Sequence, residues 1–329
     1  MTRPKLINGD VRQVLSELEP ESVQCVVTSP PYWGLRDYGS EGQLGLEETP
    51  DEYVKNMVDL FKKVKKVLKK DGTVWLNIGD NYFGGGRGDD SKLRGSNKGQ
   101  PTYDSMESSK PDWKKIKGLK PKDLVGIPWR LALALQADGW WLRNDIIWSK
   151  PNPMPEPVKD RLTKSHEYIF LLTKSKTYYY DHESIKEPYS ESSIQRINQA
   201  TFDTQQGGSK DYGKVSVHSK NTNSIRGTLE KFKENLGSGR NRRSVWQINV
   251  KPYKGAHFAT FPEEIPELCI KAGTKVGDLV LDPFVGSGTT CAVASRLGRE
   301  SIGIDLSEEY LKLARKRCKI ESESLLSYV

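Results

Sequence analysis

The sequence predicts an α/β protein built on a doubly wound, mostly parallel β-sheet. Short apolar segments alternate with amphipathic segments from residue 6 to residue 78, and the alternation returns from residue 261 onward. Such alternation is typical of β-α-β units, in which helices cover both faces of a parallel sheet. Between the two regular regions the composition becomes polar and basic, which indicates an insert. A chain of 329 residues is long enough to bury the core that this fold needs.

The N-terminal region alternates strand and helix signals in a clear order. We expect a strand end at 6–10, an amphipathic helix at 11–18 and a buried strand at 23–27. Thr49-Pro50-Asp51-Glu52 should begin the next helix, because it combines a capping residue, a first-turn proline and two acidic residues. Asp71-Gly72 should end that helix, so that residues 73–78 form the following strand.

The remaining elements belong to three stretches of the chain. We expect a long loop at 84–123, a helix at 124–137, strands at 142–148 and 168–173, and then, after an irregular stretch, a helix at 261–268, a strand at 279–282, a helix at 289–297, a strand at 301–304 and a last helix from 308. Residues 1–177 and 253–329 should therefore form one domain, interrupted by an insert at 178–252.

The positive charge of the chain is regional. The net charge is +8, and the segment from Lys174 to Lys254 holds fifteen Lys or Arg residues against eight Asp or Glu residues. This distribution favours an acidic partner such as nucleic acid for the insert. The apolar runs at 131–135 and 276–284 are too short to span a bilayer. The four cysteines and four histidines show no disulfide or metal-ligand spacing, so we expect a cytoplasmic protein without a metal site.

A glycine-rich turn, Asp282-Pro283-Phe284-Val285-Gly286-Ser287-Gly288-Thr289-Thr290, joins a predicted strand to a predicted helix. Glycines there allow positive φ and let a ligand approach the backbone, and the helix N-terminus offers free N–H groups to an anion. We therefore expect a Gly288→Val protein to fold and to lose its ligand. Asp305 ends the next strand, where an acid can accept from a ribose hydroxyl pair. The alternative is a turn with a purely structural role.

A second motif, Thr28-Ser29-Pro30-Pro31-Tyr32-Trp33, follows a buried strand. Two prolines remove backbone donors and stiffen the turn. Ser29 Oγ and the Pro30 carbonyl can then accept from a flat amino group while the Tyr32 ring stacks on its face. If only the ring matters, phenylalanine should replace Tyr32 with modest loss. The alternative is a rigid turn with a packed aromatic residue.

Together the two motifs resemble those of the DNA amino-methyltransferases, which move a methyl group from S-adenosylmethionine to an exocyclic base nitrogen. Ser29-Pro30-Pro31-Tyr32 matches the catalytic motif of that family, the Asp282 turn matches its cofactor motif, and their order is that of the β group. The resemblance spans nearly the whole chain. It implies the fold of the S-adenosylmethionine-dependent methyltransferases, with target recognition in the insert. It further implies a set of cofactor-binding residues: Asp10, Thr260, Phe261, Pro262, Asp282, Pro283, Phe284, Gly286, Ser287, Gly288, Thr289 and Asp305.

The same resemblance makes double-stranded DNA the expected substrate. A base inside a duplex must be flipped out to reach such a pocket. Candidates for contacts to DNA phosphates are Lys150, Arg240, Arg242 and Arg243. The family also implies a restriction endonuclease that acts on the same site, and we expect the chain to be a monomer or a homodimer.

The expected reaction is direct methylation of an exocyclic amine, promoted by orientation and hydrogen bonding without a covalent enzyme intermediate. Methylation at C5 of cytosine is disfavoured, because by resemblance it needs a cysteine after a proline and no cysteine here follows one. Ser29 in the leading position resembles the cytosine-N4 enzymes more than the adenine-N6 enzymes, where Asp or Asn usually leads. We therefore expect cytosine N4 as the acceptor, with adenine N6 as the alternative. A catalytically silent DNA-binding protein and a methyltransferase acting on RNA or protein amides are alternatives from other classes.

Overall fold

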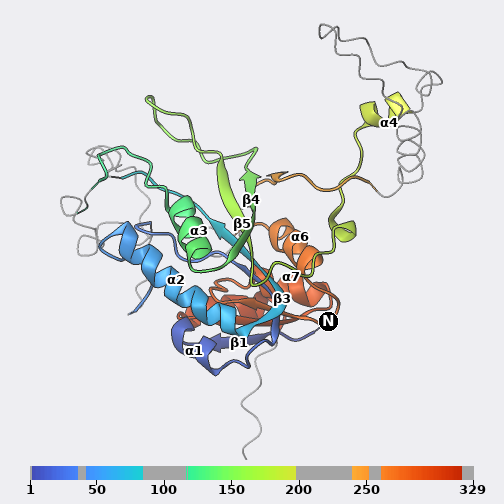
Figure 1. Ribbon diagram of the computed structural model, residues 1–329, viewed down its shortest axis with the longest axis horizontal. Helices are drawn as coiled ribbons and strands as arrows, with labels where there is room; N and C mark the ends of the chain where they lie inside the picture. Colours follow the sequence, from blue (N-terminus) through green and yellow to red (C-terminus); the bar gives the residue numbers. More distant parts are fainter. Residues whose placement is uncertain are drawn as a thin grey trace, which may run out of the picture. The chain divides into compact units, whose positions relative to one another are not determined.

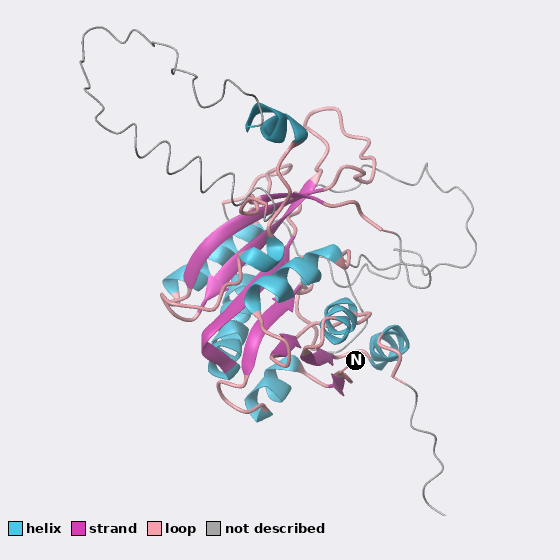
Figure 2. Cartoon of the chain, turned by 90° about the vertical axis from the view of Figure 1, so that its right-hand side faces the viewer, coloured by secondary structure: helices cyan, strands magenta, loops and turns pink. Residues whose placement is uncertain are grey.

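An eight-stranded sheet with helices on both faces forms the centre of the protein (Figures 1 and 2). The computed structural model describes residues 2–35, 42–83, 116, 118–197, 239–251 and 261–320. The strands are β1 (Lys5–Asn8), β2 (Val23–Thr28), β3 (Leu68–Ile78), β4 (Trp141–Ser149), β5 (His166–Thr173), β6 (Val245–Gln247), β7 (Leu279–Asp282) and β8 (Glu300–Asp305). The helices of the sheet unit are α1 (Val11–Glu17), α2 (Pro50–Val67), α3 (Ile127–Ala137), α6 (Glu264–Gly273), α7 (Thr289–Arg296) and α8 (Glu308–Arg317).

The strand order is β1-β8-β7-β2-β3-β5-β4-β6, and among these strands only β5 runs against the others. Helices α1, α2 and α3 pack on one face, and α6, α7 and α8 pack on the other (Figure 1). All six residues of β2 are buried, as expected for a central parallel strand covered on both faces. These features confirm the predicted doubly wound, mostly parallel α/β sheet.

Strands β7 and β2 are parallel neighbours, and the order in which strands are added to the sheet reverses between them. From β7 the strands β8 and β1 extend to one side, whereas β3 lies on the other side of β2. The connections at the carboxyl ends of β7 and β2 therefore diverge, and this is the position where open α/β sheets bind their ligands.

Helix α2 begins as predicted but ends earlier. Thr49 and Glu52 form a reciprocal capping box, and Pro50 opens the first turn. The helix stops at Val67, and Asp71 and Gly72 lie inside β3 rather than after a helix, so that part of the prediction was wrong. The physical reason is burial: Leu68 is fully buried and pairs with Val23, which makes this segment extended before the glycine is reached.

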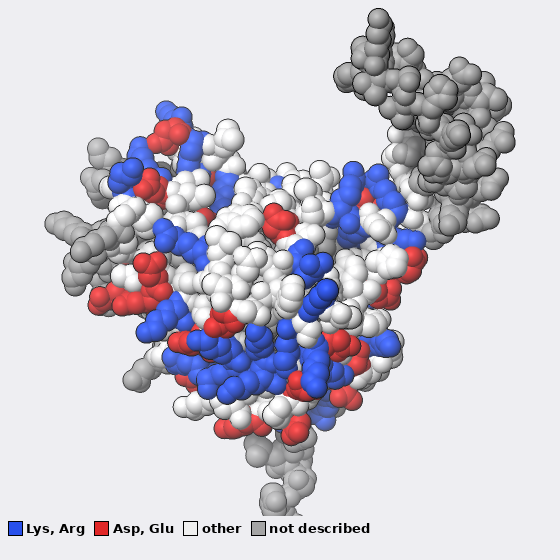
Figure 3. All heavy atoms as spheres, viewed as in Figure 1, with Lys and Arg blue, Asp and Glu red and all other residues white. Residues whose placement is uncertain are grey.

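The lysines of α2 lie on its outer face and form a basic surface over its C-terminal half (Figure 3). Several of them make local contacts: Lys62 with Asp59, Lys63 with Ser16 Oγ and Lys65 with the Gly139 carbonyl. This surface belongs to the half of α2 that leads into the start of β3, at the edge opposite the carboxyl ends of the parallel strands.

Contacts divide the chain into two compact units. The sheet unit comprises residues 1–180 and 244–329, and residues 181–243 form the second unit. The second unit contains a short 3-10 helix (Glu183–Ile185), α4 (Glu191–Ile197) and a bridge between Glu187 and Arg240. Its extent is narrower than the predicted insert at 178–252, because β6 pairs with β4 and returns the chain to the sheet at residue 245. Most of the loop predicted at 84–123 lies outside the described residues.

In the part of the chain that the structure describes, each helix is too short or too polar to cross a bilayer.

Candidate active site

The predicted motifs meet along one edge of the sheet. Going across that edge, Asp10 follows β1, Asp305 ends β8, Asp282 ends β7, Ser29 follows β2 and Gly79 follows β3. Residues at opposite ends of the sequence thus become neighbours through strand order alone. This edge is formed by the carboxyl ends of the parallel strands, and it includes the point between β7 and β2 where the strand order reverses. It therefore has the position expected of a ligand site.

Asp282 connects the glycine-rich turn to the strand that carries the Ser29 motif. Thr28 Oγ1 donates to Asp282 Oδ1 at 2.7 Å, and Thr290 Oγ1 donates to Asp282 Oδ2 at 2.7 Å. The Phe284 amide donates to Oδ1 at 3.1 Å. Burial raises the pKa of Asp282 to about 6, although the hydrogen bonds from Thr28 and Thr290 oppose that rise. Asp282 is thus a buried link between the two motifs.

Replacing Asp282 by asparagine should remove part of the pH dependence of stability. The pKa is about 6 when folded and ~3.9 in an unfolded chain. The stability contributed by the protonated group is therefore fully present below pH ~4 and is lost as the pH rises through about 6. Asparagine stays neutral and keeps an acceptor for Thr28, so a loss on the order of 3 kcal/mol should disappear. Urea unfolding of both proteins at about pH 4 and about pH 7 checks this, and an equal pH dependence in both would contradict it.

The two glycines of the turn have different surroundings. Gly286 has φ +48°, and a Cβ built on it would meet no atom of the described residues within 4 Å. Gly288 has φ +84°, and its Cβ would lie 2.8 Å from the Cβ of Ala314 in α8. Among the described residues Gly286 therefore borders open space in which a ligand can approach the backbone, whereas Gly288 allows α8 to pack on the turn. A valine at position 288 is therefore expected to lower stability as well as ligand binding.

Asp305 is held in place by the backbone of the same edge. The Gly286 amide donates to Asp305 Oδ2 and the Ser307 amide donates to Oδ1, each at 2.9 Å. Burial raises its pKa, and these backbone hydrogen bonds lower it. An ionised carboxylate has about four lone-pair positions, so each oxygen of Asp305 can still accept from a hydroxyl group.

Asp10 caps the start of α1. Its carboxylate accepts from the Arg12 amide at 2.8 Å and pairs with the Arg12 guanidinium, which lowers the pKa of Asp10. The backbone connects it to Asp305, because the Gly9 amide donates to the Asp305 carbonyl. Phe261 and the buried Pro262 precede α6, and Thr260 lies outside the described residues.

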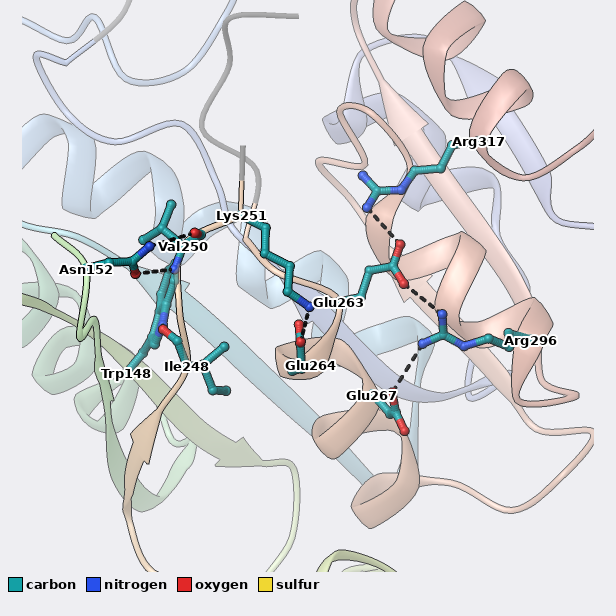
Figure 4. Close-up of polar contacts among 10 residues, drawn as sticks. All are labelled: Trp148, Asn152, Ile248, Val250, Lys251, Glu263, Glu264, Glu267, Arg296 and Arg317. Atoms are coloured by element: carbon teal, nitrogen blue, oxygen red, sulfur yellow. Dashed lines mark hydrogen bonds and ion pairs between the residues drawn. The ribbon is translucent and has the colours of Figure 1, made fainter. Parts of the chain in front are cut away.

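Arg317 joins two parts of the predicted cofactor site that are distant in sequence. Its guanidinium donates to Thr289 Oγ1 at 2.8 Å, to Ser287 Oγ at 3.2 Å and to Glu263 Oε1 at 3.0 Å. Glu263 also pairs with Arg296 (Figure 4). The sequence analysis missed Arg317, because nothing in the pattern of α8 separates it from the other basic residues of the last turn.

The segment between β6 and α6 is held by further contacts that Figure 4 shows. Trp148 Nε1 donates to the Ile248 carbonyl at 2.8 Å, and Asn152 exchanges two hydrogen bonds with the backbone of Val250. Lys251 pairs with Glu264 at the start of α6. Residues 248–251 are thus held beside the end of β4, with Lys251 in contact with the start of α6.

Replacing Arg317 by alanine should weaken cofactor binding about tenfold or more. The change removes charge-assisted hydrogen bonds to Ser287 and Thr289, each worth about 1.5–3 kcal/mol. Arg315→Ala is the matched control, because Arg315 lies on the same helix and its side chain pairs only with Glu308 among the contacts described for it. Calorimetric titration with S-adenosylmethionine compares the two proteins, and equal affinities would contradict the role of Arg317.

The Ser29 motif is part of a hydrogen-bonded cluster with β3 and β5. Ser29 Oγ donates to Tyr32 Oη at 3.2 Å, and Tyr32 Oη donates to Glu167 Oε2 at 2.7 Å. Asn77 Nδ2 lies 3.0 Å from Tyr32 Oη and 3.1 Å from Glu167 Oε2. Lys150 Nζ pairs with the other oxygen of Glu167. Sequence reasoning missed Asn77 and Glu167; the only available signal was their position at strand ends.

Tyr32 is half-buried, with its hydroxyl inside this cluster. Burial raises the pKa of Tyr32 well above its ordinary value, and the Glu167 carboxylate raises it further. A Cβ on Gly79 would lie 2.6 Å from Tyr32 Cε2, so only glycine at this position leaves room for the ring. The Pro31 carbonyl accepts from Tyr53 Oη at 2.9 Å, which ties the proline pair to α2.

The predicted phosphate-contacting residues are engaged in local contacts. Lys150 is 19% exposed and pairs with Glu167 beside the Ser29 motif. In the second unit, Arg240 and Arg243 both pair with Glu187, and Arg242 Nε donates to the Ile185 carbonyl. Of these side chains Arg243 is the most open, at 67% exposed.

Among the described ranges, no group of three or more His, Cys, Asp or Glu side chains is arranged to hold a metal ion.

Comparison with known proteins places this arrangement in a family. The model of a family described as DNA methylase, covering N6 and N4 enzymes, matches residues 23–316. Type II methyltransferase M.SmaI of Serratia marcescens is 49% identical over 95% of this chain and 90% of its own length. M.Cfr9I of Citrobacter freundii is 44% identical, over 98% and 89%.

Solved structures confirm the predicted methyltransferase fold. PvuII DNA methyltransferase (cytosine-N4-specific) superposes with a TM-score of 0.61 at 20% identity, covering 99% of this chain and 89% of that one. A DNA modification methylase of Thermus thermophilus, TTHA0409, solved with S-adenosyl-L-methionine, has a TM-score of 0.54 at 23% identity, covering 96% and 94%. From its motifs, its sheet and its relatives, the chain belongs to the N4/N6 DNA methyltransferase family.

Proposed function

We propose that the protein transfers a methyl group from S-adenosylmethionine to N4 of cytosine in double-stranded DNA. The observation that carries this proposal is the hydrogen bond from Thr28 to Asp282, which joins β2 to β7 at the point where the strand order reverses. It holds the Ser29 motif beside the glycine-rich turn, so an acceptor site and a cofactor site share one edge. Proximity of this kind is the main contribution that such a reaction requires of the protein.

The cofactor side suits a ligand with an adenosine part. Open space at Gly286 admits the ligand against the backbone, and Asp305 lies beside it with lone pairs to accept from ribose hydroxyls. Asp10 follows β1 at the same edge of the sheet. When bound, S-adenosylmethionine supplies a methyl group on a sulfonium sulfur.

The acceptor side suits an exocyclic amine. Ser29 Oγ and the Pro30 carbonyl are acceptors in the segment that follows β2, and the Tyr32 hydroxyl lies 3.2 Å from Ser29 Oγ. Acceptors at the two amine hydrogens favour the tetrahedral nitrogen that must form as it attacks the methyl group. Ser29 in the leading position supports cytosine N4, and adenine N6 is the second candidate.

Nucleoside analysis tests this proposal. The protein is incubated with S-adenosylmethionine and unmethylated DNA of varied sequence, the DNA is digested to nucleosides, and the methylated base is identified by mass spectrometry. N4-methylcytosine is the expected product. N6-methyladenine would overturn the choice of base, and a DNA-binding protein that makes no methylated product would support the silent alternative. Parallel reactions with RNA and with protein test those substrate classes.

We also propose that the insert recognises the target sequence and contributes affinity through charge. The protein would act on DNA in the cytoplasm and protect a site that a partner endonuclease cleaves, as the term type II for its relatives suggests.

Arg243→Ala should reduce the salt dependence of DNA binding, lowering the slope by about 1 for one lost phosphate contact. Its exposure makes it the best candidate among those basic residues of the second unit that the structure describes. Lys62→Ala, on the basic surface of α2, is the control that should keep the slope. Titrations at several salt concentrations compare the proteins. An unchanged slope for Arg243→Ala, or a reduced one for Lys62→Ala, would move the phosphate contacts to the other surface.

A further inference from the structure

Two hydrogen bonds and one ion pair of the cluster around Tyr32 end at Glu167. Glu167 Oε2 lies 2.7 Å from Tyr32 Oη and 3.1 Å from Asn77 Nδ2, and Lys150 Nζ pairs with Oε1. The side chains of Glu167 and Lys150 are 16% and 19% exposed. A carboxylate has no proton to donate, so Glu167 can only accept hydrogen bonds.

This acceptor determines the direction of the neighbouring bonds. Tyr32 has one hydroxyl proton, and at 2.7 Å from the carboxylate that proton must be donated to Glu167. The Tyr32 oxygen is then left as an acceptor for the Ser29 proton, at 3.2 Å. Ser29 Oγ has no other proton, and Asn77 Nδ2 donates to it at 3.4 Å, so one acceptor position remains at this atom.

We propose that Glu167 is a positioning residue for methyl transfer, which aligns the Ser29 and Tyr32 hydroxyls so that Ser29 Oγ presents a lone pair to the amine of the target base. The inference rests on the proposed function, and it applies equally to cytosine N4 and adenine N6. A Ser29 hydroxyl turned the other way would direct its proton at the amine hydrogens. In a site of low dielectric constant such a reversed bond is especially costly.

Glu167→Gln tests the polarity of this chain with little change of shape. The glutamine amide can donate to Tyr32 Oη, which frees the tyrosine proton to turn toward Ser29 and reverses the chain. Turnover at saturating cofactor should fall about 10- to 100-fold, the range for a lost charge-assisted hydrogen bond. The affinity for S-adenosylmethionine, measured by calorimetry, should stay unchanged. Glu156→Gln is the matched control. Glu156 is also a partly buried acid in an ion pair, with Arg161, and the Glu156→Gln protein should keep wild-type turnover.

A double-mutant cycle with Tyr32→Phe tests whether Glu167 acts through the tyrosine. Once the phenol oxygen is removed, Glu167→Gln should cause little further loss, so the two effects should not multiply. Independent effects, or wild-type turnover in a folded Glu167→Gln protein, would overturn the proposal. If Glu167→Gln does not fold, Tyr32→Phe carries the test alone, and full turnover in it would overturn the proposal equally. A wild-type protein that methylates no DNA would instead contradict the proposed function.

Discussion

Replacing Gly288 by valine should destabilise the protein by about 2–5 kcal/mol. A left-handed backbone costs a non-glycine residue about 1–2 kcal/mol, and overpacking adds about 1–3 kcal/mol. The overpacking arises because the new Cβ would lie 2.8 Å from the Cβ of Ala314 and 2.9 Å from its Cα. Helix α8 would have to move away from the glycine-rich turn. Denaturant unfolding of the purified proteins measures the loss.

Gly286→Ala is the matched control for this change. It adds a Cβ at φ +48° that meets no atom of the structurally described residues within 4 Å, so it should cost only the backbone strain of about 1–2 kcal/mol. Because its methyl group enters the space predicted for the cofactor, it should weaken S-adenosylmethionine binding more than it lowers stability. The reverse ranking, a stable Gly288→Val protein and an unstable Gly286→Ala protein, would show that the roles of the two glycines are exchanged.

Replacing Tyr32 by alanine should lower turnover about 100-fold or more. The change removes base stacking of about 1–3 kcal/mol and a hydrogen bond to a charged acceptor worth about 1.5–3 kcal/mol. Cofactor affinity should change far less, because Tyr32 lies on the β2 and β3 side of Asp282. Single-turnover methylation and calorimetric titration separate the two effects.

Tyr32→Phe distinguishes the ring from the hydroxyl. The sequence alone leads to the expectation that phenylalanine preserves much of the activity, whereas the bond from Tyr32 to Glu167 leads us to expect a clear loss. Tyr179→Ala is the control: this half-buried tyrosine lies beside Asp71 at the opposite edge of the sheet, so its loss should leave turnover unchanged. Full methylation by a stable Tyr32→Ala protein would refute both roles.

Local patterns in the sequence were sufficient to predict the two motifs and most elements of the sheet unit, but not β6, which lies inside the predicted insert. The capping signal at Thr49, the apolar strand before Ser29 and the strand–turn–helix around Gly286 each depend on neighbours along the chain. Their order also predicted a parallel sheet, because alternating strands and helices have few other ways to bury their apolar faces. The end of α2 was misplaced, since the burial of Leu68 against β2 outweighed a local stop signal.

The tertiary structure alone decided which residues complete the site and what each motif residue does. Glu167 joins the hydrogen-bonded cluster around Tyr32 because β5 runs antiparallel beside β3. Arg317 reaches Ser287 because α8 packs on the glycine-rich turn. Gly286 and Gly288 differ likewise because Ala314 of α8 packs against Gly288. Lys150 pairs with the Glu167 carboxylate, which belongs to β5. Spacing along one chain carries the periodicity of helices and strands, but contacts between distant segments arise only when the sheet brings their ends together.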